Sequence, residues 1–344
     1  IMILGYLGRS FILHVVFGKI DADVMYNCNT YLLIVFASIP MIAVYNAGAA
    51  VFRAMGNSSI AMTTSMIMNA INLGGNALLI YGFHRGIEGV AIPTLVSRGV
   101  AAVIILILLN DQKRQIHIFH PFSFRSEWSL LKKILYIGIP NGLENSMFQL
   151  GKILVLSWVT SFGTASIAAN AVSNNIGMFA VLPGMAMGYA LLTVSAQCVG
   201  AGDFEQVKYY NRKLIKITYL SLILINVVLL LLLPFIIKLY GLSAEASDYT
   251  YKIMIYHSIC VVTIWPLSFA LPNTLRAAAD VNYAMILSIV SMWVFRIGFS
   301  YLLGVYLKMG VFGIWVAMTI DWFFRAVCFS IRYASGKWKH ASLI

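Results

Sequence analysis

Apolar runs of about twenty residues recur along the whole chain, and short polar stretches separate them. Runs of that length suit transmembrane α-helices, whereas strands of a membrane β-barrel are about ten residues long with alternating polarity. The pattern therefore predicts an all-α polytopic membrane protein. The predicted helices span residues 1–17, 28–52, 59–82, 88–109, 134–160, 165–198, 214–239, 249–274, 281–304 and 310–331.

The longest polar connection, residues 110–133, separates four predicted helices from six. We therefore expect an N-terminal lobe at 1–109, a linker at 110–133 and a C-terminal lobe with a short tail at 134–344. Lys and Arg collect in the linker, after the sixth helix and at the C-terminus, which places these regions in the cytoplasm by the positive-inside rule. The cations concerned are Lys113, Arg114, Arg125, Lys132, Lys133, Lys208, Arg212, Lys213, Lys216, Arg332, Lys337 and Lys339.

The composition agrees with a membrane location, because 60% of the residues are hydrophobic, 10% are charged and the mean hydropathy is +0.85. The net charge of +12 comes mostly from the connections, so it does not indicate nucleic-acid binding. The chain contains no H-E-x-x-H, D-D-x-x-D or G-x-S-x-G motif, and no filter repeat of a channel. The sequence thus argues against an enzyme or a passive channel, and it implies no cofactor.

An internal repeat relates the two halves. Arg53-Ala54 aligns with Arg276-Ala277 at an offset of 223 residues, and Gly75 aligns with Gly298 at the same offset. Six predicted helices separate the two Arg-Ala turns, so the halves run parallel, as in one class of secondary transporters. The second half has room for two more helices before its turn than the first half. We therefore expect two pseudo-symmetric lobes of six helices each, with the first two helices absent from this chain.

Six segments together resemble the multidrug and toxic compound extrusion (MATE) family. They are "YNAGAAVFRAMGN" (45–57), "GIEGVAIPT" (86–94), "IGIPNGLENSMFQLGK" (137–152), "FGTASIAANAV" (162–172), "QCVGAGD" (197–203) and "LPNTLRAAADV" (271–281). The resemblance implies two six-helix lobes arranged as a V, in the lipid of a bacterial plasma membrane. It further implies that a monomer exports amphipathic, cationic organic compounds in exchange for inflowing Na+ or H+.

An alternative function comes from the same superfamily, in which some members flip lipid-linked oligosaccharides. A flippase is expected to hold a cluster of arginines for the pyrophosphate group, and Arg9, Arg98, Arg296 and Arg325 keep this alternative open. Arg9 and Arg98 also have a structural interpretation, in which their side chains snorkel to the membrane interface.

Glu144 and Lys152 lie inside the predicted helix 134–160, where an isolated charge costs at least about 2.5 kcal/mol. At about 100° per residue they share an arc of about 140° with three further polar side chains, Asn141, Asn145 and Gln149. One interpretation is a site that faces a cavity, where Glu144 exchanges a proton or binds Na+. The other is a structural ion pair between Glu144 and Lys152.

Asp321 and Arg325 lie four residues apart on the last predicted helix, and Arg296 lies inside the preceding one. The carboxylate and Arg325 could neutralise each other, or Asp321 could change partner when H+, Na+ or solute binds. On the predicted helix 165–198, Asn174 shares a face with Gly184 and Gly188, which favours either a polar cavity or close helix packing.

The sequence departs from the family pattern at one point. The resemblance implies a cation site that joins a carboxylate on helix 134–160 to another on helix 249–274. Here Phe148 occupies the first position, with Glu144 one turn before it, and residues 251–272 contain no acid. Asp321 is the other carboxylate deep in this lobe.

Overall fold

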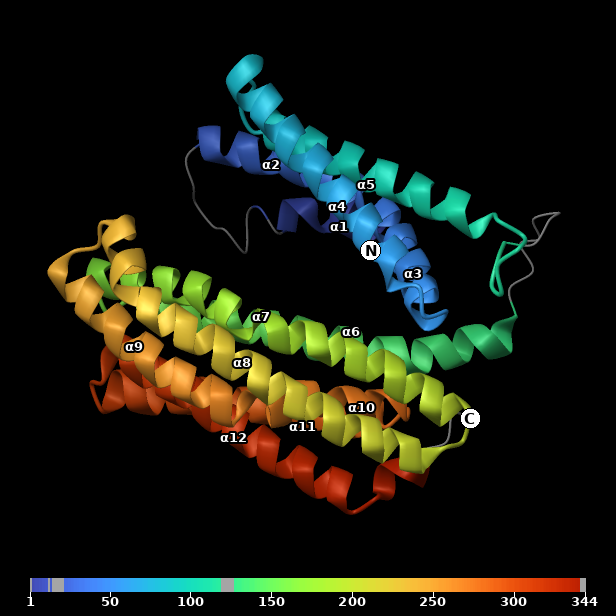
Figure 1. The fold of residues 1–344 in the computed structure, drawn as a ribbon. Coiled ribbons are helices and arrows are strands. Elements are labelled where there is room, and N and C mark those ends of the chain that lie inside the picture. The colour runs from blue at the N-terminus through green and yellow to red at the C-terminus, as the bar shows by residue number, and fades with distance from the viewer. Residues whose placement is uncertain (1, 12, 14–21, 119–126, 341–344) are drawn as a thin grey trace. The chain divides into compact units, whose positions relative to one another are not determined.

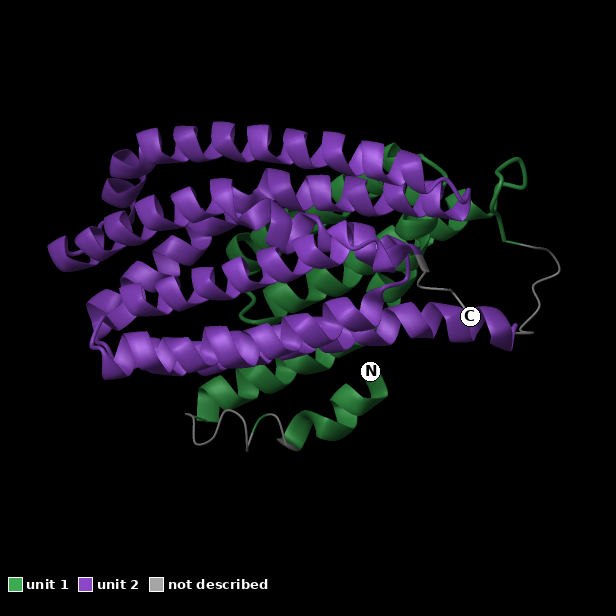
Figure 2. Cartoon of the chain, turned by 90° about the horizontal axis from the view of Figure 1, so that it is seen from below, with its two compact units in different colours: residues 1–125 green, residues 126–344 purple. Residues whose placement is uncertain are grey.

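The computed structural model describes residues 2–11, 13, 22–118 and 127–340 (Figure 1). These residues form helices and connecting turns without a strand, which confirms the predicted all-α membrane fold. The chain divides into two compact units, residues 1–125 and 126–344 (Figure 2). The division falls inside the predicted linker. Arg125, with the rest of 119–126, and residues 14–17 of the first predicted helix lie outside the described residues.

The described residues of unit 1 form five α-helices and one π-helical turn. They are α1 (Met2–Phe11), α2 (Ala22–Ala37), α3 (Ile39–Ala54), α4 (Ser58–Ala77), η2 (Leu78–Gly82) and α5 (Glu88–Leu109). Helix α5 packs along both α3 and α4. Helices α2 and α3 meet at a 41° bend next to Ser38. Arg98 of α5 donates from Nη1 to the Ser38 hydroxyl at 2.6 Å, so it is bound inside this unit and the snorkelling interpretation is wrong for Arg98.

Unit 2 contains seven α-helices, three π-helical segments and a short 3₁₀ turn. They are α6 (Trp128–Thr160), α7 (Thr164–Gly200), α8 (Phe204–Tyr240), α9 (Ala244–Thr263), η3 (Pro266–Ala270), α10 (Pro272–Ala277), α11 (Val281–Ser291), η4 (Met292–Gly298), η5 (Ser300–Tyr306), α12 (Gly310–Ala334) and η6 (Lys337–His340). Trp265, Trp315 and Trp322 contribute to a core between α6, α8, α9 and α12.

Several helices of unit 2 begin earlier than predicted, and the difference is largest for α6 and α8. Helix α6 begins at Trp128 and α8 begins at Phe204, where Oδ1 of Asp203 caps the helix by accepting the Gln206 N–H at 3.0 Å. The apolar pattern marks only the part of a helix inside the membrane, whereas capped helices extend beyond it. The cations expected in connections are therefore helical: Lys132 and Lys133 lie on α6, and Lys208, Arg212, Lys213 and Lys216 lie on α8.

Five described helical segments are long and apolar enough to cross a membrane. The count rises to seven when the bent pairs α2–α3 and α9–α10 are each taken as one span; the second pair bends by 59°. Helices α4 and α6, which the sequence also predicted as spans, do not meet this measure. Their Asn, Ser and Gly residues, together with the charges of α6, make them less apolar than the other helices.

Trp338 joins the end of the described chain to unit 2. Its side chain is 1% exposed, stacks on Tyr333 at 5.4 Å between ring centroids, and meets the Phe204 ring edge-on at 5.9 Å. The indole N–H donates to the Tyr333 carbonyl at 2.9 Å. Lys339 lies 3.7 Å from the Glu205 carboxylate. The end of α12 is thereby attached to the start of α8.

Asn226 joins α8 to α7 by donating from Nδ2 to the Ala180 carbonyl at 3.1 Å, and it is 2% exposed. We expect Asn226→Ala to lower the free energy of unfolding by about 0.6–1.7 kcal/mol, the range for hydrogen bonds between membrane helices. Thermal unfolding of the purified protein in detergent measures this change. A stability equal to that of the parent would mean that the bond contributes nothing net.

Candidate functional site

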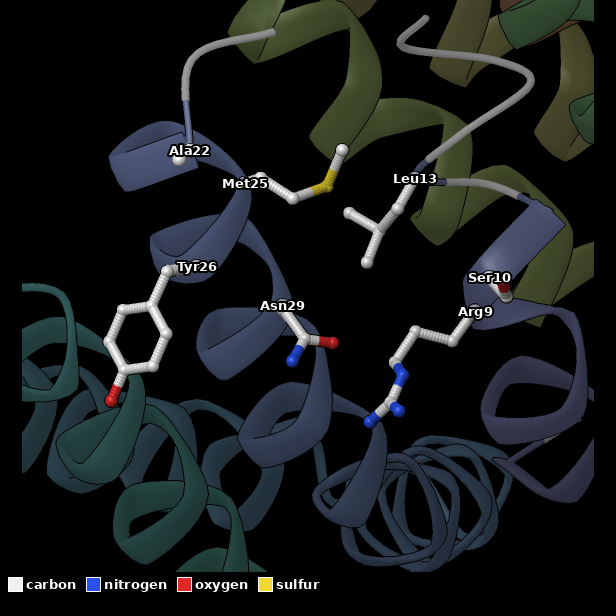
Figure 3. Close-up of a pocket in the computed structure, with 7 residues that line it drawn as sticks. All are labelled: Arg9, Ser10, Leu13, Ala22, Met25, Tyr26 and Asn29. Carbon is white, nitrogen blue, oxygen red and sulfur yellow. The ribbon is translucent and has the colours of Figure 1, made fainter. Parts of the chain in front are cut away.

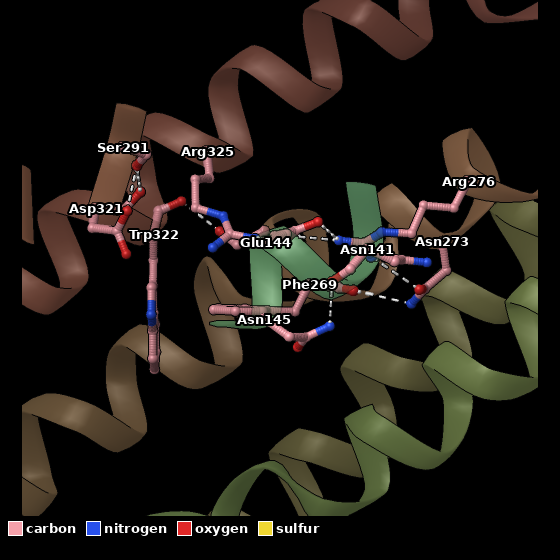
Figure 4. A network of polar contacts seen from close by, with 11 residues as sticks. Asn141, Glu144, Asn145, Phe269, Asn273, Arg276, Ser291, Asp321, Trp322 and Arg325 are labelled. Atoms are coloured by element: carbon pink, nitrogen blue, oxygen red, sulfur yellow. Dashed lines mark hydrogen bonds and ion pairs between the residues drawn. The ribbon is translucent and has the colours of Figure 1, made fainter. Parts of the chain in front are cut away.

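The central polar contact of unit 2 joins Glu144 of α6 to Arg276 of α10. Nη2 of Arg276 lies 2.7 Å from Oε1 and 2.8 Å from Oε2 of Glu144, so one guanidinium nitrogen binds both carboxylate oxygens (Figure 4). Nη1 of Arg276 donates to Oδ1 of Asn273 at 3.1 Å, and Asn273 donates to the Phe269 carbonyl at 3.1 Å. The glutamate is 8% exposed. Arg276 is therefore positioned by α10 to bind both carboxylate oxygens of Glu144.

Arg325 is the second cation at Glu144. Its Nη2 lies 3.5 Å from Oε1 of Glu144, and its guanidinium lies over the Phe269 ring at 4.7 Å. The described residues contain no ion pair between Arg325 and Asp321, so the expected pairing within α12 is wrong. The expected pair of Glu144 with Lys152 is also wrong, because eight residues of helix separate the two by about 12 Å.

Asp321 is fully buried on α12 and only partly satisfied. Its Oδ1 accepts a hydrogen bond from the Ser291 hydroxyl of α11, while Oδ2 has no partner among the described residues (Figure 4). Arg296 and Arg325 both lie within Coulombic reach of this carboxylate. The structure thus brings together the two cations and the anion that the sequence placed on neighbouring helices. It gives Asp321 one oxygen that is free to bind a proton or cation.

Lys152 and Arg296 meet at Phe148. The Lys152 ammonium and the Arg296 guanidinium each lie 5.1 Å from the centre of the Phe148 ring. Neither cation has a hydrogen bond or ion pair in the described part of the chain; the aromatic ring is their shared contact. Arg296 belongs to the π-helical segment η4, a type of helix distortion that is frequent at functional sites.

The amide side chains predicted for the site differ in whether they make hydrogen bonds. Asn145 donates to the Asn141 carbonyl at 2.8 Å, and Asn174 donates to the Asn170 carbonyl at 2.8 Å, so both satisfy backbone within their own helices. Gln149 makes no hydrogen bond among the described residues and is exposed on the face of α6 that carries Lys152. Of the predicted stripe on α6, Asn145, Gln149 and Lys152 are exposed, whereas Glu144 is buried.

The glycines of α7 allow close packing, as one interpretation expected. A Cβ atom at Gly184 would overlap the ring of Trp265, and one at Gly188 would lie 2.9 Å from Nδ2 of Asn273. These glycines also border a pocket of about 190 Å³, which is lined in addition by Met185, Tyr189 and Phe269. Asn273 lines this pocket and also accepts a hydrogen bond from Arg276, so the pocket and the Arg276 network meet at this residue.

Unit 1 has a separate pocket between α1 and α2. Its volume is about 390 Å³, and its polar side chains are those of Arg9, Ser10, Tyr26 and Asn29 (Figure 3). Arg9 therefore lines a pocket of this unit.

Sequence reasoning missed Arg276 as a site residue and identified it only as one end of the internal repeat. Its identity with Arg53 was the signal that could have drawn attention to it. Asn273, Phe269 and Ser291 carry no pattern of their own. They enter the site through the fold, since helices α10, α11 and α12 bring them to Glu144 and Asp321.

Most of the site residues of unit 2 lie in a segment that matches a known sequence family. The MatE family model matches residues 140–302, which contain Glu144, Phe148, Lys152, Arg276 and Arg296. The chain is 26% identical to the probable multidrug resistance protein YoeA of Bacillus subtilis over 311 residues, which cover 86% of this chain and 65% of that relative. Residues 140–302 thus form a MatE family domain.

Another relative is the probable multidrug resistance protein NorM of Thermotoga maritima. It is 21% identical over 337 residues, covering 96% of this chain and 71% of that protein. The fold is similar to the solved structure of an outward-facing multidrug resistance MATE transporter of the MOP superfamily, with a TM-score of 0.86 at 20% identity, over 98% of this chain and 77% of that one. The chain spans 65% of the length of YoeA, a little under two thirds.

Proposed function

We propose that this protein is a secondary transporter that exports amphipathic organic compounds from a bacterial cell in exchange for inflowing H+ or Na+. Its place would be the cytoplasmic membrane, with the linker and the C-terminus in the cytoplasm, and it would act as a monomer by alternating access. The observation that carries the proposal is a pair of buried carboxylates between helices of an apolar bundle: Arg276 and Arg325 contact Glu144, and the Ser291 hydroxyl contacts Asp321. Ionisable groups at such depth mark ion and substrate pathways.

The two carboxylates differ in how readily each of them could bind an inflowing cation. Both oxygens of Glu144 contact a guanidinium nitrogen, so a proton or Na+ would have to displace Arg276. Asp321 offers an unpartnered oxygen next to a hydroxyl. Binding of a cation there would weaken its attraction for Arg296 and Arg325 and change the charge of the site. We therefore assign the coupling role first to Asp321, with Glu144 anchoring the arginines.

The test is Asp321→Asn, which keeps the size of the side chain and the contact with Ser291 but removes the charge. We expect the rate of rhodamine 123 export, driven by a pH or Na+ gradient in proteoliposomes, to fall about tenfold or more, because coupling energies of 1–3 kcal/mol correspond to about 5–150-fold. The remaining export should no longer depend on the gradient.

The matched control is Asp248→Asn, since Asp248 is 57% exposed at the start of α9, where it pairs with Lys252. It should leave export unchanged. Gradient-dependent export that survives Asp321→Asn would exclude Asp321 as the coupling group. Absence of any export of organic compounds by the parent protein would overturn the proposed function.

A further inference from the structure

The ionisable side chains inside unit 2 carry more positive than negative charge. Asp280 is buried and is neutralised by its ion pair with Arg332. The other two buried acids, Glu144 and Asp321, alternate with three arginines: Arg276 contacts Glu144, Arg325 lies next to both acids, and Arg296 lies near Asp321. This alternating series begins and ends with a cation. Lys152 adds a second uncompensated charge beside Arg296 at Phe148.

The excess charge is concentrated where Lys152 and Arg296 face one ring. Arg276 and Arg325 are bound by carboxylate oxygens, whereas Lys152 and Arg296 lie over Phe148 and make no hydrogen bond or ion pair in the described chain. A cation–π contact stabilises a charge by less than placing that charge at the membrane centre costs. Arg296 lies near the middle of the span Val281–Tyr306. The ring alone therefore does not compensate these cations.

The surroundings of the two cations are open and rich in donors. Lys152 and Gln149 are both exposed on α6, three residues apart and so on neighbouring positions of one helix face, and Arg296 is partly buried beside them. Polar side chains inside a membrane are unstable against lipid tails, so exposed polar groups on this face favour contact with water or solute. Phe148 supplies an apolar surface next to the cations.

We infer that Lys152, Arg296 and Gln149 form a binding site for the carboxylate or sulfonate group of an amphipathic organic anion, whose apolar body packs on Phe148. The inference rests on the proposed function and names its substrate class. An anion here compensates both cations through charge-assisted hydrogen bonds, which are about twice as strong as neutral ones. The charge balance thus favours the opposite charge to the cationic solute that the family resemblance led us to expect.

A pair of dyes with the same xanthene ring system and opposite charge tests this site. Fluorescein is anionic and rhodamine 123 is cationic; their binding to the purified full chain in a neutral maltoside detergent is measured by fluorescence anisotropy. We expect the parent to bind fluorescein at least about tenfold more tightly than rhodamine 123. Lys152→Met should weaken fluorescein binding about tenfold, and Lys152→Arg should restore it.

Lys133→Met is the matched control, because Lys133 is exposed near the start of the same helix; it should leave both affinities unchanged. Equal affinity for the two dyes, or an equal effect of Lys152→Met and Lys133→Met on fluorescein, overturns the anion site. Export of the dyes from proteoliposomes separates the two proposals. Fluorescein binding that depends on Lys152 without export of either dye supports the site and contradicts the proposed function, whereas export of rhodamine 123 without such binding does the reverse.

Discussion

Glu144→Ala should lower the free energy of unfolding of unit 2 by about 3–5 kcal/mol, the cost of removing one partner from a buried ion pair. The substitution leaves Arg276 without the two carboxylate contacts at 2.7 and 2.8 Å and deprives Arg325 of its nearest anion. Arg325 is 2% exposed, so water does not readily replace that anion. Thermal and denaturant unfolding of the purified protein measures the change.

A double-mutant cycle separates the pair from the rest of the network. Arg276→Met alone should also destabilise, because it leaves Glu144 with Arg325 at 3.5 Å as its remaining partner. The cycle uses the single variants Glu144→Met and Arg276→Met. The double variant with both substitutions should lose less stability than the sum of these two single changes, since no charge of the pair is left alone. Strict additivity would show that Glu144 and Arg276 do not interact in the folded protein.

Trp338→Ala should cost about 3–5 kcal/mol, the usual penalty for truncating a buried tryptophan. The indole is 1% exposed, and its loss removes the stacking on Tyr333, the contact with Phe204 and a hydrogen bond to the Tyr333 carbonyl. The attachment of α12 to α8 weakens as a result. Limited proteolysis at the C-terminal end, together with thermal unfolding, reports the effect.

Trp338→Phe provides the comparison for this prediction. The smaller ring keeps stacking on Tyr333 and loses the N–H, so we expect it to recover more than half of the lost stability. If the alanine and phenylalanine variants unfold at the same temperature, the contribution of the ring contacts is refuted. If the alanine variant unfolds at the same temperature as the parent, the contacts of Trp338 contribute nothing to stability.

The positions of the helices could be predicted from hydropathy because each span must bury about twenty apolar residues, whatever its partners are. The same argument singled out Glu144, Asp321, Arg296 and Arg325, since a charge inside such a run is costly. Local pattern also found the polar stripe on α6. These predictions depend only on the helix to which each residue belongs.

The partners could not be predicted, because they depend on packing between distant segments. Arg276 lies 132 residues from Glu144 and is brought to it by the bend before α10. Asp321 and Arg325 suggested a local pair by their spacing, but Arg325 turns to Glu144 and Phe269, and Asp321 turns to Ser291. The π-helical segments η3, η4 and η5 also lack a signal in the hydrophobic pattern, since their apolar residues fit a regular helix equally well.

The 59° bend between α9 and α10 makes the Glu144–Arg276 contact sensitive to small rotations. Residues Pro266–Ala277 extend about 18 Å beyond the bend at 1.5 Å per residue, and Arg276 lies at their far end. A change of about 5° in the bend displaces that end by about 1.6 Å, which stretches a 2.7 Å hydrogen bond beyond its normal range of about 3.2 Å. Rotation of this segment about the bend therefore either breaks the contact between Arg276 and Glu144 or moves α6 together with the segment.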